Sequence, residues 1–204
     1  MPGKQAKILS QEHVDDLLFF ADHTRLRLRN RVIMQLSLKA GLRAGEIAKL
    51  TWDMVLDASG SIACALELRD HAAKMGSGRT IPLHRELQES LRELRQSSSR
   101  SVTVIRSERG GPMTPLSIVI WFSRAYEKLG LDGCSSHSGR RTFVTKAARL
   151  VHKTGGSLRD VQLLAGHRSI QTTQRYIDGD SDAHSGGWYL CSSAWPLGTP
   201  RRFR

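Results

Sequence analysis

The sequence is poor in the residues that mark secreted, disulfide-bonded or membrane proteins. Only three of its 204 residues are cysteine, an odd number without a C-x-x-C spacing. This count argues against a disulfide framework and a structural zinc site, and it favours a reducing cytoplasm. No run of about 18 apolar residues is present, and the first residues contain no apolar core typical of a secretory signal. We therefore expect a cytoplasmic protein that has no membrane partner.

Acidic residues are also scarce relative to basic ones. The chain has 31 Lys or Arg and 19 Asp or Glu, which gives a formal net charge of +12 and a pI near 10.4. Hydrophobic residues make up 39% of the chain, a share typical of folded globular proteins. The length allows one good-sized domain or at most two small ones. A folded domain with this much positive charge predicts a polyanionic partner, most simply nucleic acid.

Apolar periodicity predicts a mainly α-helical α+β fold with a small three-stranded antiparallel sheet. Helices are expected in seven segments: Gln11–Ala21, Leu28–Ala40, Gly45–Leu50, Leu87–Ser97, Pro115–Leu129, His137–Val151 and Ser157–Leu164. Ser10, Thr114 and Ser157 are the expected N-caps, and Gly41 is an expected helix stop. The expected strands are Ile62–Leu68, Arg79–Leu83 and Val102–Ile105, and the first two flank a glycine-bearing hairpin loop.

Composition divides the chain into three parts. Residues 1–9 are expected to form a loose basic tail and residues 10–182 one folded domain. Residues 183–204 contain two of the four tryptophans and two adjacent glycines but no helical periodicity, so we expect an atypical tail that lacks regular structure. Arginines alternate at positions 25, 27, 29 and 31 and cannot share one helix face. They are interpreted mainly as a solvated surface, with phosphate contact as the alternative.

Four separate segments each present basic or nucleophilic side chains where a predicted element begins or ends. Taken singly, such residues are more often ordinary surface or packing residues. Taken together, in this order along the chain, they contain the groups that transfer of a phosphoryl group requires without a metal ion. The six residues are Arg43, Lys74, His137, Arg140, His167 and Tyr176.

Attack on a phosphodiester needs a nucleophile, positive charge beside the non-bridging oxygens and a proton for the leaving oxygen. Tyr176 would supply the nucleophile, and Arg43 and Arg140 would neutralise the charge. Lys74 would protonate the leaving 5′-oxygen, while the two histidines would hold the phosphate and assist proton transfer.

These segments resemble those of the tyrosine recombinases, or phage integrases. The matching strings are GLRAGEI around Arg43, a lysine followed five residues later by RTIPL, HSGR, LAGH, and a tyrosine nine residues after His167. The resemblance covers roughly residues 8–178 and implies the integrase catalytic-domain fold. It also implies cleavage and rejoining of duplex DNA through a 3′-phosphotyrosine intermediate, with no cofactor and no metal. The implied assembly is a tetramer on DNA, associated with the nucleoid. Because no amphipathic helix follows Tyr176 to dock on a neighbouring copy, we expect a monomer when the chain is free.

The sequence departs from the family pattern at several points. Arg141 stands where a second histidine is usual and Gly139 where leucine is common, and neither position is expected to do chemistry. Full-length relatives carry a separate DNA-binding domain ahead of the catalytic one, which the 24 residues before Arg25 are too few to form. A minimal or truncated recombinase is therefore expected.

Three alternatives remain open. They are a catalytically poor DNA-binding relic, a nickase similar to type IB topoisomerases, and, as the least expected, a metal-dependent nuclease. The last is disfavoured because no cluster of acidic and histidine ligands surrounds the tyrosine in the sequence.

Overall fold

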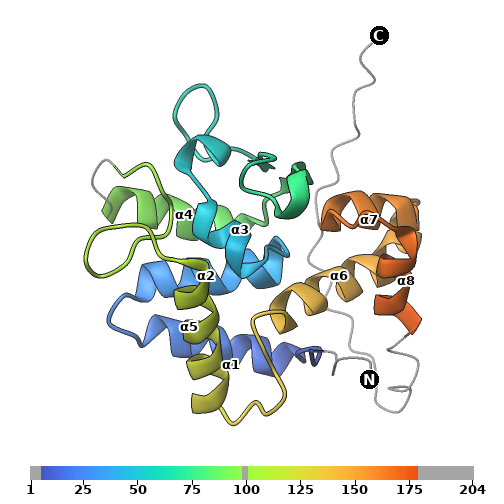
Figure 1. Ribbon diagram of the computed structural model, residues 1–204, viewed down its shortest axis with the longest axis horizontal. Helices are drawn as coiled ribbons and strands as arrows, with labels where there is room; N and C mark the ends of the chain where they lie inside the picture. Colours follow the sequence, from blue (N-terminus) through green and yellow to red (C-terminus); the bar gives the residue numbers. More distant parts are fainter. Residues whose placement is uncertain (1–5, 98–100, 179–204) are drawn as a thin grey trace.

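The computed structural model describes residues 6–97 and 101–178, which form a mainly helical domain with one small sheet (Figure 1). None of the helices in these two ranges is long and apolar enough to cross a membrane. In chain order the elements are α1 (Gln11–Asp22), α2 (Arg27–Lys39), α3 (Ala44–Lys49), β1 (Ala65–Leu68), β2 (Arg79–Pro82), α4 (Arg85–Ser97), α5 (Pro115–Lys128), α6 (Ser138–Val151), α7 (Leu158–Ala165) and α8 (Ile170–Asp178), with short 3₁₀ turns at Trp52–Met54, Lys74–Gly76 and His152–Thr154.

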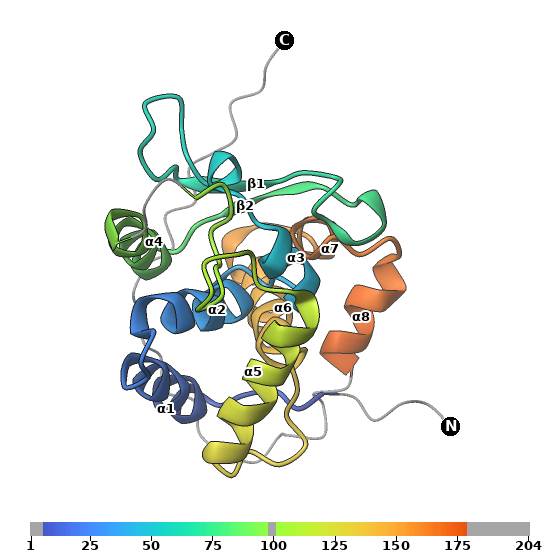
Figure 2. The same ribbon diagram turned by 60° about the vertical axis from the view of Figure 1, so that its left-hand side comes forward.

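Helix α2 is the centre of the larger part of the molecule. It contacts α1, α3, α4 and α6, and Figure 2 shows it enclosed between these elements. Its side chains are buried almost without interruption from Val32 to Leu38. The two polar residues of this run, Gln35 and Ser37, are buried together with the apolar ones because α1, α3, α4 and α6 surround the helix.

A second, smaller apolar cluster joins α6, α7 and α8. It is built from Phe143, Val144 and Val151 of α6 together with Val161 and Ala165 of α7. Figure 1 shows α7 and α8 beside α6, at one side of the molecule. Because α6 also packs on α2, it holds the small cluster against the main core.

The helix ends follow the capping residues expected from the sequence. The hydroxyls of Ser10 and Thr114 each accept a hydrogen bond at 3.1 Å from the backbone N–H three residues later. Ser157 and Asp160 form the expected capping box, in which the Ser157 N–H donates to the carboxylate at 2.8 Å. Gly41 follows α2 with a φ of +64°, a conformation that favours glycine. These predictions are confirmed.

The predicted three-stranded sheet is wrong, because the described residues form a sheet of two strands. β1 and β2 pair antiparallel with Leu66 opposite Ile81. The segment Val102–Ile105 pairs instead with the chain that follows α3. The Trp52 N–H donates to the carbonyl of residue 102 at 3.0 Å, and the N–H of residue 104 donates to the Leu50 carbonyl at 2.9 Å. These bonds produce one isolated bridge and not a third strand of the hairpin sheet.

Two other segments differ from expectation. Tyr176 lies in a helix of its own, α8, which the apolar pattern did not predict. Residues 6–9, expected to belong to a loose basic tail, pack against α6. Leu9 is buried and its N–H donates to the Thr142 hydroxyl at 2.9 Å, while the Ala6 carbonyl accepts from Arg141 at 2.7 Å. Residues 1–5 and the tail over 183–204 lie outside the described ranges.

Helices α2 and α6 pack closely against each other at Gly139. A Cβ atom added there would lie 2.4 Å from the Ser37 hydroxyl oxygen and 3.1 Å from the Ser37 Cβ. Rotating the hydroxyl would not relieve the whole contact, because the Ser37 Cβ and backbone carbonyl carbon also lie 3.1 and 3.4 Å from the added atom. The packing therefore requires glycine at a position where the family commonly has leucine.

We predict that Gly139→Ala destabilises the fold. Inside a helix this change normally stabilises by up to about 1 kcal/mol, whereas here the clash with Ser37 should cost on the order of 1–3 kcal/mol of unfolding free energy. Urea denaturation measures the loss, and adding Ser37→Gly to the same chain should recover most of it. A stabilised single variant would show that the two helices are not in close contact.

Candidate active site

The structure brings the six predicted residues to one junction between α3, α6, the α7–α8 connection and the hairpin loop. Each lies at or near the end of an element, where side chains face a common space. Their positions are directly before α3 (Arg43), in the 3₁₀ turn of the hairpin loop (Lys74), directly before α6 (His137), in the first turn of α6 (Arg140), between α7 and α8 (His167) and in α8 (Tyr176).

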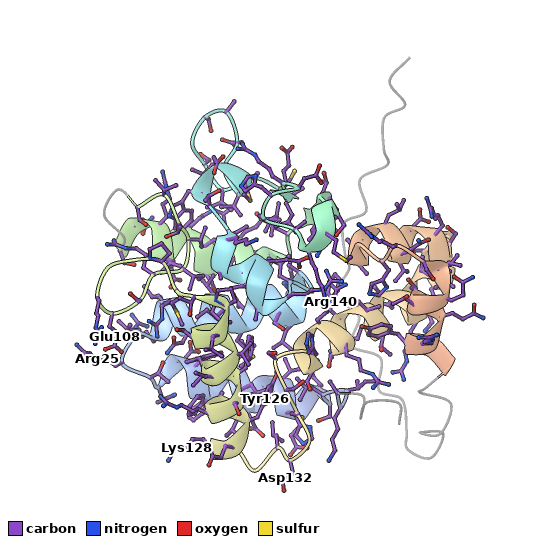
Figure 3. All side chains as sticks on the ribbon, in the orientation of Figure 1. Arg25, Glu108, Tyr126, Lys128, Asp132 and Arg140 are labelled. Carbon is purple, nitrogen blue, oxygen red and sulfur yellow. The ribbon has the colours of Figure 1, made fainter. Side chains whose placement is uncertain are left out.

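Arg140 is the most deeply placed of the six, with 3% of its surface exposed. Its Nη1 and Nη2 groups donate to the carbonyls of Gly41 and Ala165, both at 2.5 Å, so it links the end of α2 to the end of α7. Figure 3 shows Arg140 between α6 and α3. Burial, and then the charges of Arg43 and Arg79, lower the pKa of Arg140 to about 10. The guanidinium therefore remains charged at neutral pH.

A buried carboxylate, Glu46, balances part of this positive charge. Its oxygens accept from the Arg43 Nη1 at 2.8 Å and from the two terminal nitrogens of Arg79 at 3.1 and 3.0 Å. Burial alone would raise the pKa of Glu46, but the hydrogen bonds and charges of the two arginines outweigh it and lower the pKa to about 2. Glu46 is therefore ionised at neutral pH and fixes both guanidinium groups.

His167 is buried beside these arginines and is neutral at pH 7. Burial lowers its pKa to about 4, together with the neighbouring positive charges, of which Arg140 contributes most. Its Nδ1 lies 2.9 Å from the Thr173 hydroxyl, and its backbone carbonyl accepts from the Gln162 amide at 2.9 Å. The first contact orients the imidazole ring, and the second holds the backbone of the connection between α7 and α8.

Tyr176 lies against His167. The two rings are stacked with their centroids 5.3 Å apart and an angle of 24° between their planes. The phenol is also close enough to Arg140 for the two charges to interact. Tyr176 lines a cavity of about 290 Å³, which His137, Arg141 and four other residues complete: Ala6, Ser135, Thr172 and Arg175. A side chain of the nucleophilic type thus faces an open space and adjoins both a neutral imidazole and a guanidinium.

His137 and Lys74 stand at the exposed side of the junction. Partial burial lowers the pKa of His137, and the positive charges of Arg140, Arg43 and Lys74 lower it further. Lys74 is therefore near enough to His137 for its ammonium charge to act on the imidazole, although the two residues are far apart in sequence. Both side chains are accessible to a large substrate.

Three residues of this junction were not found by reasoning from the sequence: Glu46, Arg79 and Thr173. Glu46 follows Arg43 by three residues in GLRAGEI, and an acidic residue inside a basic motif was a usable signal. Arg79 opens the RTIPL string but received no role. Thr173 is one of several hydroxyl residues near Tyr176, and nothing in the sequence distinguished it.

The alternating arginines lie elsewhere. Figure 3 shows Arg25 and Glu108 at the edge of the molecule opposite Arg140. Arg25 is exposed and pairs with Glu108 at 3.3 Å, and Arg29 donates to the Arg106 carbonyl at 3.2 Å. These residues do not take part in the junction.

Positive charge dominates the junction. Over residues 6–97 and 101–178, no three His, Cys, Asp or Glu side chains are grouped so that they could hold a metal ion. Arg43 and Arg79 bond to one buried carboxylate, and Arg140 lies near enough for the same carboxylate charge to act on it. The arrangement is suited to an additional anion, such as a phosphodiester.

We predict that Glu46→Gln destabilises the fold by about 3 kcal/mol, because it leaves the buried Arg79 without a counter-charge. Chemical denaturation at pH 7 measures this loss. Glu127→Gln, on the exposed face of α5, is the matched control and should change stability by less than about 0.5 kcal/mol.

We also predict that the stability lost in Glu46→Gln depends on pH. A carboxyl group whose pKa is lower in the folded state contributes stability that is fully present above its unfolded pKa of about 4.3 and is lost as the pH falls toward the folded value. The folded pKa of Glu46 is about 2. The stability difference between the unaltered chain and Glu46→Gln should thus shrink between pH 4 and pH 2. A difference independent of pH over this range would contradict the ion pair.

Comparison with known proteins places the chain and its fold in one family. The sequence model of the Phage integrase family matches residues 7–182. Tyrosine recombinase XerC of Myxococcus xanthus is 30% identical over 191 residues, which cover 86% of this chain and 59% of that protein. Tyrosine recombinase XerD of Corynebacterium glutamicum is 28% identical and is covered over 53% of its length. The chain thus spans between half and three fifths of these relatives.

Solved structures have the same fold. The Tn1549 transposon integrase in complex with a circular intermediate DNA matches 89% of this chain with a TM-score of 0.68 and 19% identity, and 66% of that chain is covered. A lambda integrase tetramer bound to a Holliday junction matches 91% of this chain with a TM-score of 0.68 and 20% identity, over 51% of its own length. With the family match over residues 7–182, these similarities show that the chain belongs to the phage integrase family.

Proposed function

We propose that this chain is the catalytic part of a tyrosine recombinase, which breaks and rejoins strands of duplex DNA through a 3′-phosphotyrosyl intermediate. The observation that carries the proposal is the placement of Tyr176. Its ring stacks on the neutral His167, within the field of Arg140 and beside an open cavity. A nucleophile stacked on an imidazole, with a guanidinium near enough for its charge to act, forms the minimum set for attack on a phosphodiester.

In the cleavage step the Tyr176 oxygen attacks the phosphorus atom and releases its proton to solvent, while the bond between phosphorus and the 5′-oxygen breaks. Lys74, which is exposed and near His137, donates a proton to the departing oxygen. Rejoining is the reverse, in which a 5′-hydroxyl attacks the phosphotyrosine. Because the covalent link conserves the energy of the phosphodiester, the reaction needs no nucleotide cofactor.

Arg43 and Arg140 hold the non-bridging oxygens. Two of the five N–H groups of Arg140 bond to backbone carbonyls, which leaves the others for the phosphate. Arg43 is held by Glu46 on one side. Neutral His167 donates one hydrogen bond through the ring nitrogen that does not face Thr173. His137 provides a further donor at the exposed side.

The partner is double-stranded DNA. The chain has a net charge of +12 and exposes His137 and Lys74 at the junction, so it attracts the negatively charged phosphates of DNA. Because one relative is seen as a tetramer on a Holliday junction, we propose the same assembly on DNA and a monomer when free. We propose that residues 10–182 form the catalytic domain. Recombination would then take place in the cytoplasm, at the nucleoid.

A suicide DNA substrate, nicked next to the cleavage site, should trap a covalent adduct of the chain. Tyr176→Phe removes only the hydroxyl and should abolish the adduct while folding and DNA affinity remain. Tyr126→Phe, which removes a buried hydroxyl from α5, is the control and should still form the adduct. An adduct on Tyr176→Phe would contradict the assignment of the nucleophile. Cleavage and resealing without strand exchange would favour the nickase alternative.

Arg140→Lys should slow cleavage by about 10²–10³, because lysine keeps the charge but cannot reproduce the planar fork. The fork also bonds to Gly41 and Ala165, so the free energy of unfolding is measured on the same variant. Arg92→Lys on the exposed face of α4 serves as the control. Cleavage near the unaltered rate in Arg140→Lys would show that the fork does not bind the phosphate.

A further inference from the structure

We infer that Arg168 is a positioning residue for Lys74: it ties the tip of the hairpin loop to the α7–α8 connection that carries His167. The inference rests on the proposed function, in which Lys74 protonates the leaving oxygen. It concerns a side chain that stands outside the six catalytic positions and has no contact with Tyr176 among the described interactions.

The root of the hairpin loop is anchored in the body of the domain. Ala72 and Ala73 are buried, and their N–H groups both donate to the Arg69 carbonyl at 3.0 Å. The Asp70 carboxylate accepts from the Gly78 N–H at 2.8 Å and closes the loop across its base. Only the four residues from 74 to 77 project beyond these anchors.

The projecting tip holds a conformation that its own residues do not favour. Met75 has a φ of +59°, and it is the one non-glycine residue with positive φ in the part of the chain that the structure describes. Its side chain is 65% exposed, so side-chain burial does not compensate for this conformation. A left-handed non-glycine residue persists where surrounding contacts hold it, and the carbonyl of Met75 has such a contact.

That contact comes from Arg168. Its Nη2 donates to the Met75 carbonyl at 3.1 Å, across a separation of 93 residues in the chain. Within the loop, the Ser77 hydroxyl donates to the Lys74 carbonyl at 2.9 Å, and the Ser77 carbonyl accepts a longer bond of 3.4 Å from Arg79. Arg168 is thus the residue that reaches the tip from outside the hairpin.

Arg168 directly follows His167, so its bond to the Met75 carbonyl links the hairpin loop to the segment that holds the imidazole. The imidazole is buried and fixed by Thr173, while the next side chain is exposed and reaches the loop. One backbone turn therefore sets the positions of both the neutral imidazole and the lysine that precedes Met75. Without the bond to Arg168, Lys74 would be near the leaving oxygen for a smaller fraction of the time, and proton donation would slow.

The inference is tested with Arg168→Ala in single-turnover cleavage at saturating DNA. Two suicide substrates are compared, one with the natural 5′-oxygen and one with a 5′-bridging phosphorothiolate, whose sulfur leaves without a proton. Arg168→Ala should slow the oxygen substrate by about fivefold to tenfold, as expected for the loss of one hydrogen bond, and leave the sulfur substrate unchanged. Arg92→Ala, an exposed arginine of α4, should affect neither.

A double variant tests the coupling. If Arg168 acts through Lys74, Lys74→Ala with Arg168→Ala should be no slower than Lys74→Ala alone. Equal slowing of both substrates by Arg168→Ala, or additive losses in the double variant, would overturn the inference. The first of these results would instead assign Arg168 to direct contact with DNA.

Hydrogen exchange tests whether Arg168 anchors the hairpin loop, and it does so without a cleavage reaction. In the full chain without DNA, Arg168→Ala should speed exchange at the amides of residues 74–77 by at least about threefold, and Arg92→Ala should not. Unchanged exchange would overturn the inference. Failure of the unaltered chain to form any adduct would contradict the proposed function, and the exchange result would still decide whether Arg168 holds the loop.

Discussion

The ion pairs of Glu46 are the interaction on which the rest of the junction depends. Three guanidinium groups lie close together in a largely buried space, and two of them bond to this one carboxylate. Buried like charges at such a density are tolerated only when a counter-charge is present. Because one carboxylate cannot neutralise three arginines, the folded chain retains excess positive charge. A bound phosphodiester would supply the missing anion, so the arrangement that stabilises the fold also prepares the site.

In the packing, too, one residue has both a structural and a proposed functional role. Arg140 is a structural link, bonded to carbonyls at the ends of α2 and α7, and it is also the proposed phosphate ligand. The small cluster of α6, α7 and α8 is joined to the main core through α6, whose close contact with α2 requires Gly139. A change in the spacing of α2 and α6 at Gly139 would shift His167 and Tyr176 together. The six positions therefore depend on the packing of two apolar cores, although few of them belong to either.

The sequence predicted the positions that local chemistry determines. N-caps at Ser10, Thr114 and Ser157 depend on neighbouring residues only, and the six site residues form a recognisable order along the chain. What it could not predict depends on contacts between distant segments. Val102–Ile105 has strand composition, but its partner is the chain after α3 and not the hairpin. Arg79 gained a role only when the fold placed Glu46 beside it, and Arg168 only when the fold placed it against Met75.

We propose that the free protein holds a preformed cationic site around Arg43, Arg79 and Arg140, which a phosphodiester completes. The pKa of His167 measures this most directly, because burial and the charge of three arginines hold it at about 4. NMR titration of the imidazole, assigned with His167→Gln, should find it neutral from pH 6 to 8 in the free chain. Binding of an uncleaved duplex to Tyr176→Phe should raise that pKa, since the phosphate charge favours the imidazolium. An ordinary pKa near 6.5 in the free chain, or no change on binding DNA, would contradict the account.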